Sequence, residues 1–277
     1  MSISPVVDVD WLTEHLEHAP LRVVDCRWYL TDPAGGRAAY DEGHIPGAIF
    51  MSLDDDLSAA IGPGRHPLPS REAFASTLGA HGIGNRSVVV AYGNRGGGIA
   101  ARLWWMMRWV GHRTVAVLDG GIEAWEAADR PISTLLPSHE PTRYELGEAT
   151  MPTIDREALL PRLGAVTLMD ARAHERYGGD YEPIDAVGGH IPSAVNAPYE
   201  ATMGDDGRLH DPETLRSRFT QLGATEGSET IVYCGSGVTA CQNILALELA
   251  GLGTATLYPG SWSDWSGDPA TPKVTGS

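Results

Sequence analysis

Two kinds of hydrophobic pattern alternate along the chain. Short apolar runs, rich in β-branched residues and bounded by polar residues or glycine, are typical of buried strands. Longer segments with helical spacing lie between them. The strands are expected near residues 21–25, 47–50, 88–92, 115–118, 166–170, 193–197, 230–234 and 255–258. Strands that alternate with helices predict an α/β fold, in which a mostly parallel sheet carries helices on both faces.

The two halves of the chain contain the same four blocks in the same order. The first block is a strand that ends in Asp, with Arg two residues later, and the second begins with His-Ile-Pro. The third is a strand, a glycine-containing turn and an apolar helix, and the fourth is a turn followed by a tryptophan. The blocks are 21–27, 44–49, 88–105 and 118–125, repeated at 166–172, 190–195, 229–247 and 258–265. The separations of 140 to 146 residues indicate a tandem repeat.

The stretch between the two halves breaks this rhythm. Pro131, Pro137, Pro141 and Pro152 interrupt any helix there. We therefore expect one domain over residues 1–130, a linker over 131–152 and a second domain over 153–277. The last residues, 266–277, are rich in Gly, Pro, Ser and Thr and are expected to form a poorly ordered tail.

The segment 230–241, T-I-V-Y-C-G-S-G-V-T-A-C, has features typical of a reactive cysteine. Its strand stops at Cys234, and a glycine-containing loop leads into a helix that should begin near Thr239. A helix N-terminus and unpaired backbone amides lower the pKa of a thiol and stabilise the thiolate. Gly235 and Gly237 allow the tight backbone path that such a loop needs. Cys234 is thus a predicted nucleophile, and the alternative is a buried structural cysteine.

These motifs resemble a known family. The paired H-I-P-[GS]-A blocks, the D-G-G…W block and the loop C-G-S-G-V-T-A-C look like those of two-domain rhodaneses, the thiosulfate and 3-mercaptopyruvate sulfurtransferases. The resemblance extends from Val7 to Trp265. It implies two tandem rhodanese-like domains, of which only the C-terminal one is catalytic. Tyr92 is aligned with Cys234 in the first half, so the first loop has no nucleophile.

The resemblance implies sulfur transfer in two steps. The Cys234 thiolate would take sulfur from 3-mercaptopyruvate or thiosulfate and form a persulfide, which a nucleophilic acceptor then discharges. The acceptor would be cyanide or a thiol, and a thioredoxin-like protein is a candidate. No metal and no organic cofactor are needed, because backbone N–H groups would stabilise the persulfide. Those groups belong to Gly235, Ser236, Gly237, Val238, Thr239 and Ala240.

Further site residues follow from the same resemblance. Arg176 matches the family's substrate-binding arginine and would pair with an anionic donor, although a surface role is the alternative. His44 and Trp28 match positions that face the cleft in relatives. His44 equally suits a turn brace, and Trp28 equally suits the core. Ser236 would bind a carboxylate or pass a proton, unless it only shapes the loop.

Other conspicuous residues are expected to be structural. Asp25 and Asp170 end strands and should fix neighbouring loops, and Arg172 is a partner for such a carboxylate. Cys26 and Cys241 are expected to be packing cysteines. A buried helix face is expected to contain Trp104, Trp105, Met106, Met107 and Trp109.

Two features of the chain disagree about the sulfur donor. Many thiosulfate enzymes have C-R-K-G-V-T in the active loop, whereas Gly235-Ser236 here resembles mercaptopyruvate sulfurtransferases. Many of those enzymes carry a second arginine in an E-P-R segment, where this chain has Glu182-Pro183-Ile184. We favour mercaptopyruvate and expect measurable activity with thiosulfate.

A reactive cysteine loop is also typical of two other functions. Phosphatases on related folds require C-x5-R, and the sixth residue after Cys234 is Ala240, so the contact that binds phosphate is missing. A persulfide carrier for a protein partner remains open, and slow turnover with small acceptors would distinguish it from an enzyme.

Composition limits the binding partners and the cellular compartment that are expected for this chain. The net charge of −16 opposes binding to nucleic acid or to an anionic membrane. Three cysteines without metal-site spacing indicate neither a disulfide framework nor a zinc site. The N-terminal segment has no basic leader or long apolar core, and no apolar run reaches 18 residues. These features predict a cytoplasmic protein.

Overall fold

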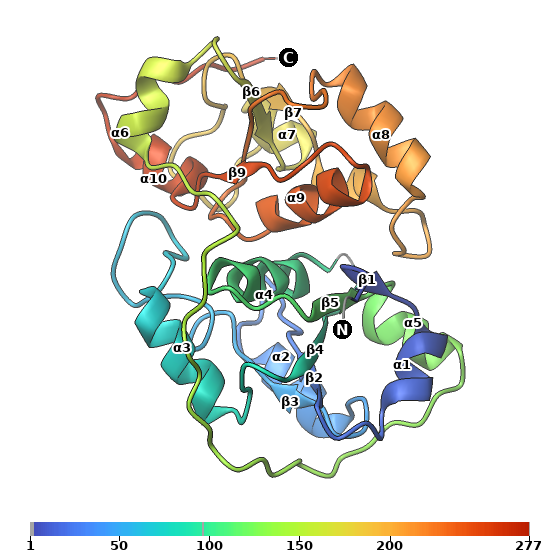
Figure 1. The fold of residues 1–277 in the computed structure, drawn as a ribbon. Helices are drawn as coiled ribbons and strands as arrows, with labels where there is room; N and C mark the ends of the chain where they lie inside the picture. The colour runs from blue at the N-terminus through green and yellow to red at the C-terminus, as the bar shows by residue number, and fades with distance from the viewer. Residues whose placement is uncertain (1–2, 96, 277) are drawn as a thin grey trace. The chain divides into compact units, whose positions relative to one another are not determined.

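The computed structural model describes residues 3–95 and 97–276, which divide into two compact units (Figure 1). Unit 1 comprises the residues up to Ala59 together with Pro69–Thr150 and Asp205–Leu209. Unit 2 comprises Ala60–Leu68, Met151–Gly204 and the residues from His210 onward. Each unit is built around its own parallel sheet.

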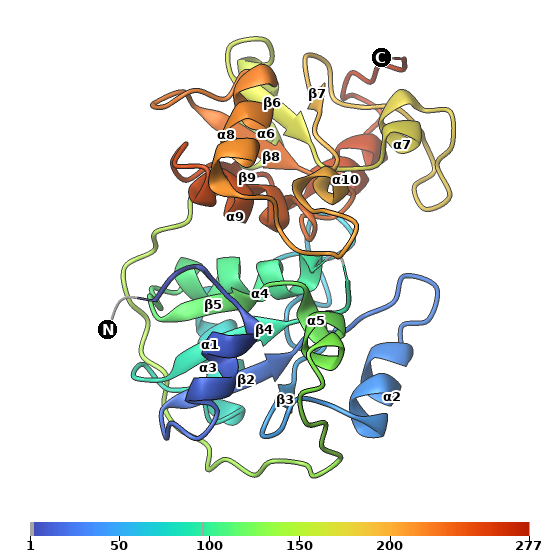
Figure 2. The ribbon, with the colours of Figure 1, turned by 90° about the vertical axis from the view of Figure 1, so that its right-hand side faces the viewer.

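The sheet of unit 1 has the strand order β1-β5-β4-β2-β3, and all its pairs are parallel (Figure 2). Its strands are β1 (Val6–Val7), β2 (Leu21–Asp25), β3 (Ile49–Phe50), β4 (Val88–Tyr92) and β5 (Val115–Leu118). The central strands are almost continuously apolar because helices cover both of their faces.

The helices of unit 1 cover this sheet from two sides (Figure 1). They are α1 (Val9–His15), α2 (Gly35–Glu42), α3 (Arg71–Ala80), α4 (Gly98–Trp109) and α5 (Gly121–Ala127). Leu12 of α1 and Trp125 of α5 share a core with Val90, whereas α4 contacts β4 and β5. Side chains cap two of the helices: Asp8 accepts from the Trp11 amide, and Ser70 accepts from the Ala73 amide.

Unit 2 repeats this arrangement with one strand fewer. Its sheet has the order β7-β6-β8-β9, again parallel. The strands are β6 (Thr167–Asp170), β7 (Val195–Asn196), β8 (Thr230–Tyr233) and β9 (Thr256–Leu257). A parallel bridge between Thr153 and Leu257 occupies the place that β1 takes beside β5 in unit 1. The predicted fold class is therefore confirmed.

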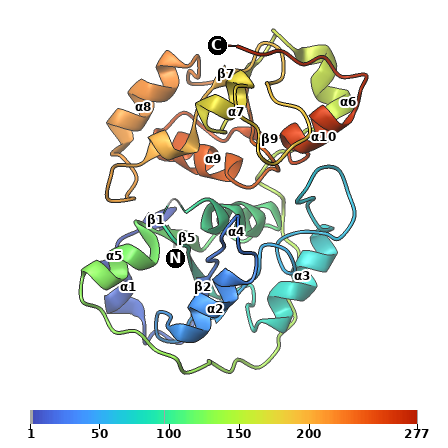
Figure 3. The same ribbon diagram turned by 180° about the vertical axis from the view of Figure 1, so that it is seen from behind.

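The helices of unit 2 lie on both faces of its sheet, as Figures 1 and 3 show. Tyr177, Trp262 and Trp265 form a core with the strands on one face, and α9 packs against β8 and β9. The helices are α6 (Arg156–Leu159), η1 (Leu160–Arg162), α7 (His174–Gly178), η2 (Tyr199–Thr202), α8 (Pro212–Gln221), α9 (Ala240–Leu249) and α10 (Ser261–Gly267).

A buried Asp-x-Arg ion pair occurs at the same place in each unit. Asp25 Oδ2 accepts from Arg27 Nη2 at 2.7 Å, and Asp170 Oδ2 accepts from Arg172 Nη2 at 2.6 Å. Each arginine also donates to the carbonyl of the residue before a His-Ile-Pro motif, Gly43 or Gly189, at 2.6 Å. The ion pair thus joins the end of a central strand to the loop that leads into the next strand.

The eight strands expected from the sequence correspond to β2 to β9, but β1 was missed. Two consecutive valines give no periodic signal, and Val6 and Val7 become a strand only because β5 offers a free edge. The expected apolar face of α4 is largely confirmed, since Trp104 to Met107 are buried. Trp109, at the end of that helix, is only half-buried, so its placement in the core was wrong.

The compact units differ from the expected domain limits in three places. Ala60–Leu68 groups with unit 2 although it precedes the linker, and Asp205–Leu209 groups with unit 1. Pro131 to Thr150 belongs to unit 1, where it runs without a regular element and the Thr142 amide donates to Gly79 O. The outermost residues of the expected domains, 1, 2 and 277, lie outside the described residues.

The C-terminal segment is packed against unit 2, contrary to the tail expected from its composition. Val274 pairs with His190 in an antiparallel bridge, and the Trp265 indole donates to Pro272 O at 2.8 Å. Thr271 is buried, and its hydroxyl lies within hydrogen-bonding distance of Trp265 O. Hydrogen bonds to the buried core, rather than composition, decide the conformation of this segment.

Within residues 3–95 and 97–276, no helix is both long enough and apolar enough to cross a membrane.

Candidate active site

Cys234 follows β8 directly, and its backbone is fixed by the start of α10. Cys234 O accepts from the Trp262 amide and Gly235 O from the Ser263 amide, both at 2.9 Å. The Cys234 amide donates to Ser261 Oγ at 3.1 Å. These contacts attach the cysteine loop to the element that carries the repeated tryptophan, so the loop is positioned before any ligand arrives.

Gly237 is required by the path of this loop. Its φ of +74° lies in the left-handed region that favours glycine. A Cβ at this position would lie 2.5 Å from Pro259 O, far inside contact distance. Gly235, by contrast, faces two arginine side chains rather than backbone.

The amides of the loop are largely unused by the protein itself. Among the described residues, the N–H groups of Gly235, Ser236, Val238, Thr239 and Ala240 donate to no backbone carbonyl or side chain. Thr239 is the N-cap of α9, so the helix begins one residue later, at Ala240. Cys234 is 2 % exposed. Unused amides and a helix N-terminus beside a shielded sulfur give a site suited to an anion.

The strand register corrects the alignment of Cys234 with the first repeat. Asp25 pairs with Tyr92, and Asp170 pairs with Tyr233, so the two tyrosines are counterparts. The Tyr92 hydroxyl donates to Asp25 at 2.6 Å, and burial, with Asp25 second, raises the pKa of this phenol. The residue equivalent to Cys234 is therefore Gly93, not Tyr92. Gly93 O accepts from the Ile122 amide just as Cys234 O accepts from Trp262. The first loop still has no thiol.

Two residues near the cysteine loop were not anticipated from sequence. His66 Nδ1 lies 2.8 Å from Ser236 Oγ, and the Arg65 amide donates to Ser263 Oγ at 3.0 Å. Both come from Ala60–Leu68, about 170 positions earlier in the chain. The Gly- and Pro-rich sequence of this segment predicts a loop, but contains no signal for which residues it meets.

Arg176 lies close to the cysteine loop, and its guanidinium group is paired with two carboxylates. Its Nε and Nη2 donate to Glu182 at 2.9 to 3.1 Å, and Nη2 also donates to Asp185 at 3.1 Å. Burial alone would raise the pKa of Glu182, but the hydrogen bonds from Arg176 and from the Ile184 and Asp185 amides lower it. A Cβ on Gly235 would lie 3.4 Å from Arg176 Nη2.

Tyr199, at the start of η2, is a further residue near the thiol, although no sequence motif points to it. Burial, chiefly, and then the charges of Glu200 and Cys234 raise the pKa of its phenol to about 12. The phenol is therefore neutral at physiological pH. It forms a polar but uncharged part of the surroundings of Cys234.

His44 and Trp28 lie in unit 1. The His44 ring is fully buried and stacks on Tyr40, with Nδ1 2.8 Å from Tyr40 O and Nε2 3.1 Å from Leu135 O. Both ring nitrogens are thus engaged by backbone carbonyls, which supports the turn-brace interpretation and leaves neither for substrate. His190 stacks on Tyr177 in the same way in unit 2. Trp28 is half-buried and donates to Asp54 Oδ2 at 3.3 Å, and its contact with substrate stays a prediction.

Cys26 and Cys241 are both fully buried. Burial, with Asp25 and Asp56 adding to it, raises the pKa of the Cys26 thiol well above its ordinary value. The Cys241 thiol contacts Gly237 O at 3.5 Å, inside the first turn of α9. The raised pKa disfavours the thiolate of Cys26, and Cys241 packs beside the cysteine loop.

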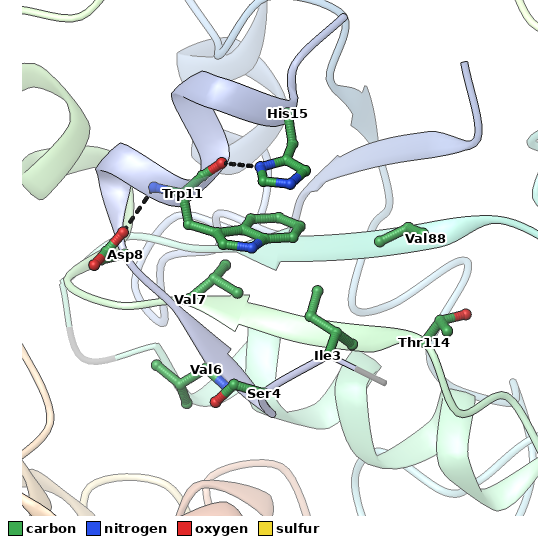
Figure 4. A pocket seen from close by; sticks show the side chains of 9 residues that line it. All are labelled: Ile3, Ser4, Val6, Val7, Asp8, Trp11, His15, Val88 and Thr114. Carbon is green, nitrogen blue, oxygen red and sulfur yellow. Dashed lines mark hydrogen bonds between the residues drawn. The ribbon is translucent and has the colours of Figure 1, made fainter. Parts of the chain in front are cut away.

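A separate pocket of about 250 Å³ lies in unit 1, between β1 and α1 (Figure 4). Trp11 stacks on His15 along one wall, and Val88 and Thr114 contribute to the lining. The pocket is mostly apolar and contains no cysteine, so it supplies none of the groups that sulfur transfer needs.

The chain is similar to proteins of one family over nearly its whole length. Residues 8–128 and 156–268 match the family description "Rhodanese-like domain". A protein of Pseudomonas aeruginosa described as a "Probable 3-mercaptopyruvate sulfurtransferase" is 43 % identical over 283 residues, covering 100 % of both chains. The thiosulfate sulfurtransferase of Rattus norvegicus is 34 % identical over 271 residues, covering 94 % of this chain and 91 % of the rat protein.

A solved structure agrees with these relatives. The 3-mercaptopyruvate sulfurtransferase from Leishmania major superposes with a TM-score of 0.84 at 32 % identity, over 95 % of this chain and 74 % of that one. Two α/β units related by a tandem repeat, together with these relatives, define the class as a two-domain sulfurtransferase. The chain belongs to the rhodanese family. It is a sulfurtransferase, as its full-length relatives are.

Replacement of Gly237 should test whether the loop path is as constrained as the geometry indicates. Gly237→Ala is expected to lower the free energy of unfolding by about 2–5 kcal/mol, because left-handed strain adds to a clash with Pro259 O. Gly253 is the matched control: its φ is +89°, and a Cβ there meets nothing within 4 Å. Gly253→Ala should therefore cost only about 1–2 kcal/mol in urea unfolding. Equal losses for both variants would contradict the steric account.

Proposed function

We propose that the chain transfers sulfane sulfur through a persulfide on Cys234, with 3-mercaptopyruvate as the preferred donor. The single observation that carries this proposal is the loop itself. A cysteine at a strand end is followed by five unused amides and by the N-terminus of a ten-residue helix. These groups suit a negatively charged persulfide, which is a species that needs donors and no metal.

In the first half-reaction, sulfur moves from the donor to Cys234, and the leaving group depends on the donor. With thiosulfate, the Cys234 thiolate attacks the outer sulfur, the S–S bond breaks and sulfite leaves with the electron pair. With mercaptopyruvate, the same attack breaks a C–S bond, and the departing enolate needs a proton at carbon to become pyruvate. That proton comes from the donor's own thiol. Mercaptopyruvate therefore requires a proton carrier, and thiosulfate does not.

The contact between Ser236 and His66 supplies a candidate for that carrier. Ser236 is two residues from Cys234, and its hydroxyl lies 2.8 Å from His66 Nδ1. A hydroxyl both donates and accepts, and an imidazole exchanges protons near neutral pH. We assign to this pair the movement of the proton from the donor's sulfur to the enolate carbon.

The second half-reaction discharges the persulfide to a nucleophile. Cyanide or a low-molecular-weight thiol would attack the outer sulfur and regenerate the Cys234 thiolate. A thioredoxin-like protein is a candidate acceptor in the cell. All three cysteines are free thiols in the structure, which supports a reducing compartment and hence a cytoplasmic location.

Mass spectrometry of the intact protein tests the covalent step. After incubation with either donor, the wild-type chain should gain one sulfur, about 32 Da from the atomic mass, on Cys234. Cys234→Ser should gain nothing, because an alcohol at this position is not ionised. Cys26→Ser and Cys241→Ser are the matched controls and should load normally. Loading that persists in Cys234→Ser would refute the mechanism.

Steady-state kinetics test the choice of donor. We expect kcat/KM for 3-mercaptopyruvate to exceed kcat/KM for thiosulfate, because the loop carries Ser236 rather than the additional cations of C-R-K-G loops, and because a full-length relative bears the former name. A tenfold or larger preference for thiosulfate would reverse this ordering, while leaving the Cys234 chemistry intact.

Replacement of Ser236 tests the proton carrier. Ser236→Ala should lower kcat with 3-mercaptopyruvate by about a hundredfold, the lower end of the usual contribution of acid–base catalysis. The rate with thiosulfate should change by no more than about threefold, because that reaction moves no proton. Thiosulfate thus serves as the internal control for folding and for loop geometry. A similar loss with both donors would mean that Ser236 only shapes the loop.

A further inference from the structure

Two arginines that are far apart in sequence share one carboxylate beside the cysteine loop. Arg65 Nη1 donates to Asp185 Oδ1, and Arg176 Nη2 donates to Asp185 Oδ2. Asp185 thus bridges the two guanidinium groups. Burial is the main cause that raises the pKa of Asp185, and the charge of Arg65 opposes that rise.

Both guanidinium groups face the residue that follows the nucleophile. A Cβ built on Gly235 would lie 2.9 Å from Arg65 Nη2, 3.4 Å from Arg176 Nη2 and 3.5 Å from Arg176 Nη1. Two guanidinium groups therefore lie within contact distance of the Cβ position of Gly235, the residue that follows Cys234. A side chain at this position would share that space with the two guanidinium groups.

The arrangement leaves the arginines nearer to solvent than their partners. The side chains of Glu182 and Asp185 are 5 % and 7 % exposed, whereas those of Arg176 and Arg65 are 17 % and 31 % exposed. The carboxylates hold the guanidinium groups from beneath. Each guanidinium has five N–H donors. Glu182 and Asp185 accept from Nε and Nη2 of Arg176, and Asp185 accepts from Nη1 of Arg65, so these carboxylates do not use every donor.

The sequence lacks an arginine at the position where one was expected. Ile184 occupies the place of the second arginine of the E-P-R segment, and its side chain carries no charge. Its amide instead donates to Glu182 Oε1 at 3.0 Å and helps to hold the carboxylate under Arg176. The segment 182–185 has therefore lost one cation, and Arg65 brings a cation to the same place from Ala60–Leu68.

We infer that Arg65 is a specificity-determining residue that binds the anionic end of the sulfur donor together with Arg176, in place of the arginine missing at Ile184. This inference rests on the proposed function of Cys234. The chemistry that the pair recognises is a carboxylate or a sulfonate group next to a transferable sulfur, because planar guanidinium groups form paired hydrogen bonds with such oxygen atoms.

A purely structural role for Arg65 would be to fasten its own loop. The loop has other attachments, however: the Arg65 amide donates to Ser263 Oγ, and His66 contacts Ser236. Neither of these uses the Arg65 side chain beyond Cβ. Truncation at this position therefore removes the cation while the backbone attachments remain.

The test compares Arg65→Ala with the wild-type enzyme using three sulfur donors. For 3-mercaptopyruvate and thiosulfate, KM should rise about tenfold or more, as for the loss of a charge-assisted hydrogen bond, with little change in kcat. The persulfide of 2-mercaptoethanol carries neither a carboxylate nor a sulfonate. It should load Cys234 at the wild-type rate, as judged by intact mass. Arg65→Lys, which keeps the charge, should recover part of the lost affinity for the two anionic donors.

Arg156→Ala is the matched control. Arg156 lines the same surface groove as Arg65, but its side chain pairs with Asp264 and Asp268 rather than facing Gly235. Its KM values should stay at the wild-type level. Unchanged KM values in Arg65→Ala would overturn the inference, and so would an equal loss of rate with all three donors, which would indicate fastening of the loop. Absence of loading in the wild-type enzyme would instead reject the proposed function of Cys234.

Discussion

The buried Asp-x-Arg ion pair is the interaction on which the rest of each unit depends. It lies where a central strand ends, and the arginine reaches the carbonyl before His-Ile-Pro. A buried charge without its partner is strongly destabilising, by about 3–5 kcal/mol, so neither member can be lost alone. In unit 2 the pair also continues outward: Arg172 donates to Glu182, Glu182 accepts from Arg176, and Asp185 joins Arg176 to Arg65. Alternating charges thus connect the end of β6 to the surface over Gly235.

The two repeats share their fold but differ in how far their ion pairs extend. In unit 1 the corresponding pair, Asp25 and Arg27, ends at Gly43 and the Tyr92 hydroxyl, inside the core. In unit 2 the cysteine loop is attached to α10 by the same backbone contact that attaches Gly93 to α5. The scaffold is therefore common to both units. What distinguishes unit 2 is the thiol after β8, where unit 1 has Gly93 after β4, and the carboxylates that extend from Arg172 to the arginines.

Local patterns were sufficient to predict β2 to β9 and the repeat, and to select Cys234 as a candidate nucleophile, because each depends on residues that are adjacent in sequence. Asp25, Asp170 and Arg172 were also correctly interpreted as structural, since a charged pair at a strand end has few other roles. The contacts of Arg65 and His66 could not be predicted, because they depend on where a glycine- and proline-rich loop meets residues about 170 positions away. The alignment of Tyr92 with Cys234 was wrong by one residue. Two tyrosines end β4 and β8, and only the strand register shows that they are equivalent.

The two features that disagree about the donor concern different chemical tasks. Ile184 concerns the binding of an anion, whereas Ser236 concerns the transfer of a proton. Binding an anion requires cations, and the loss of charge at Ile184 matters only if no other segment replaces it. Moving a proton requires a group that both donates and accepts, and Ser236 beside His66 is such a group. A loop with two extra cations would favour a dianion and would need no proton carrier. A loop with a hydroxyl beside an imidazole suits a donor whose leaving group must be protonated. The contact between Ser236 and His66 therefore argues for mercaptopyruvate more strongly than Ile184 argues against it.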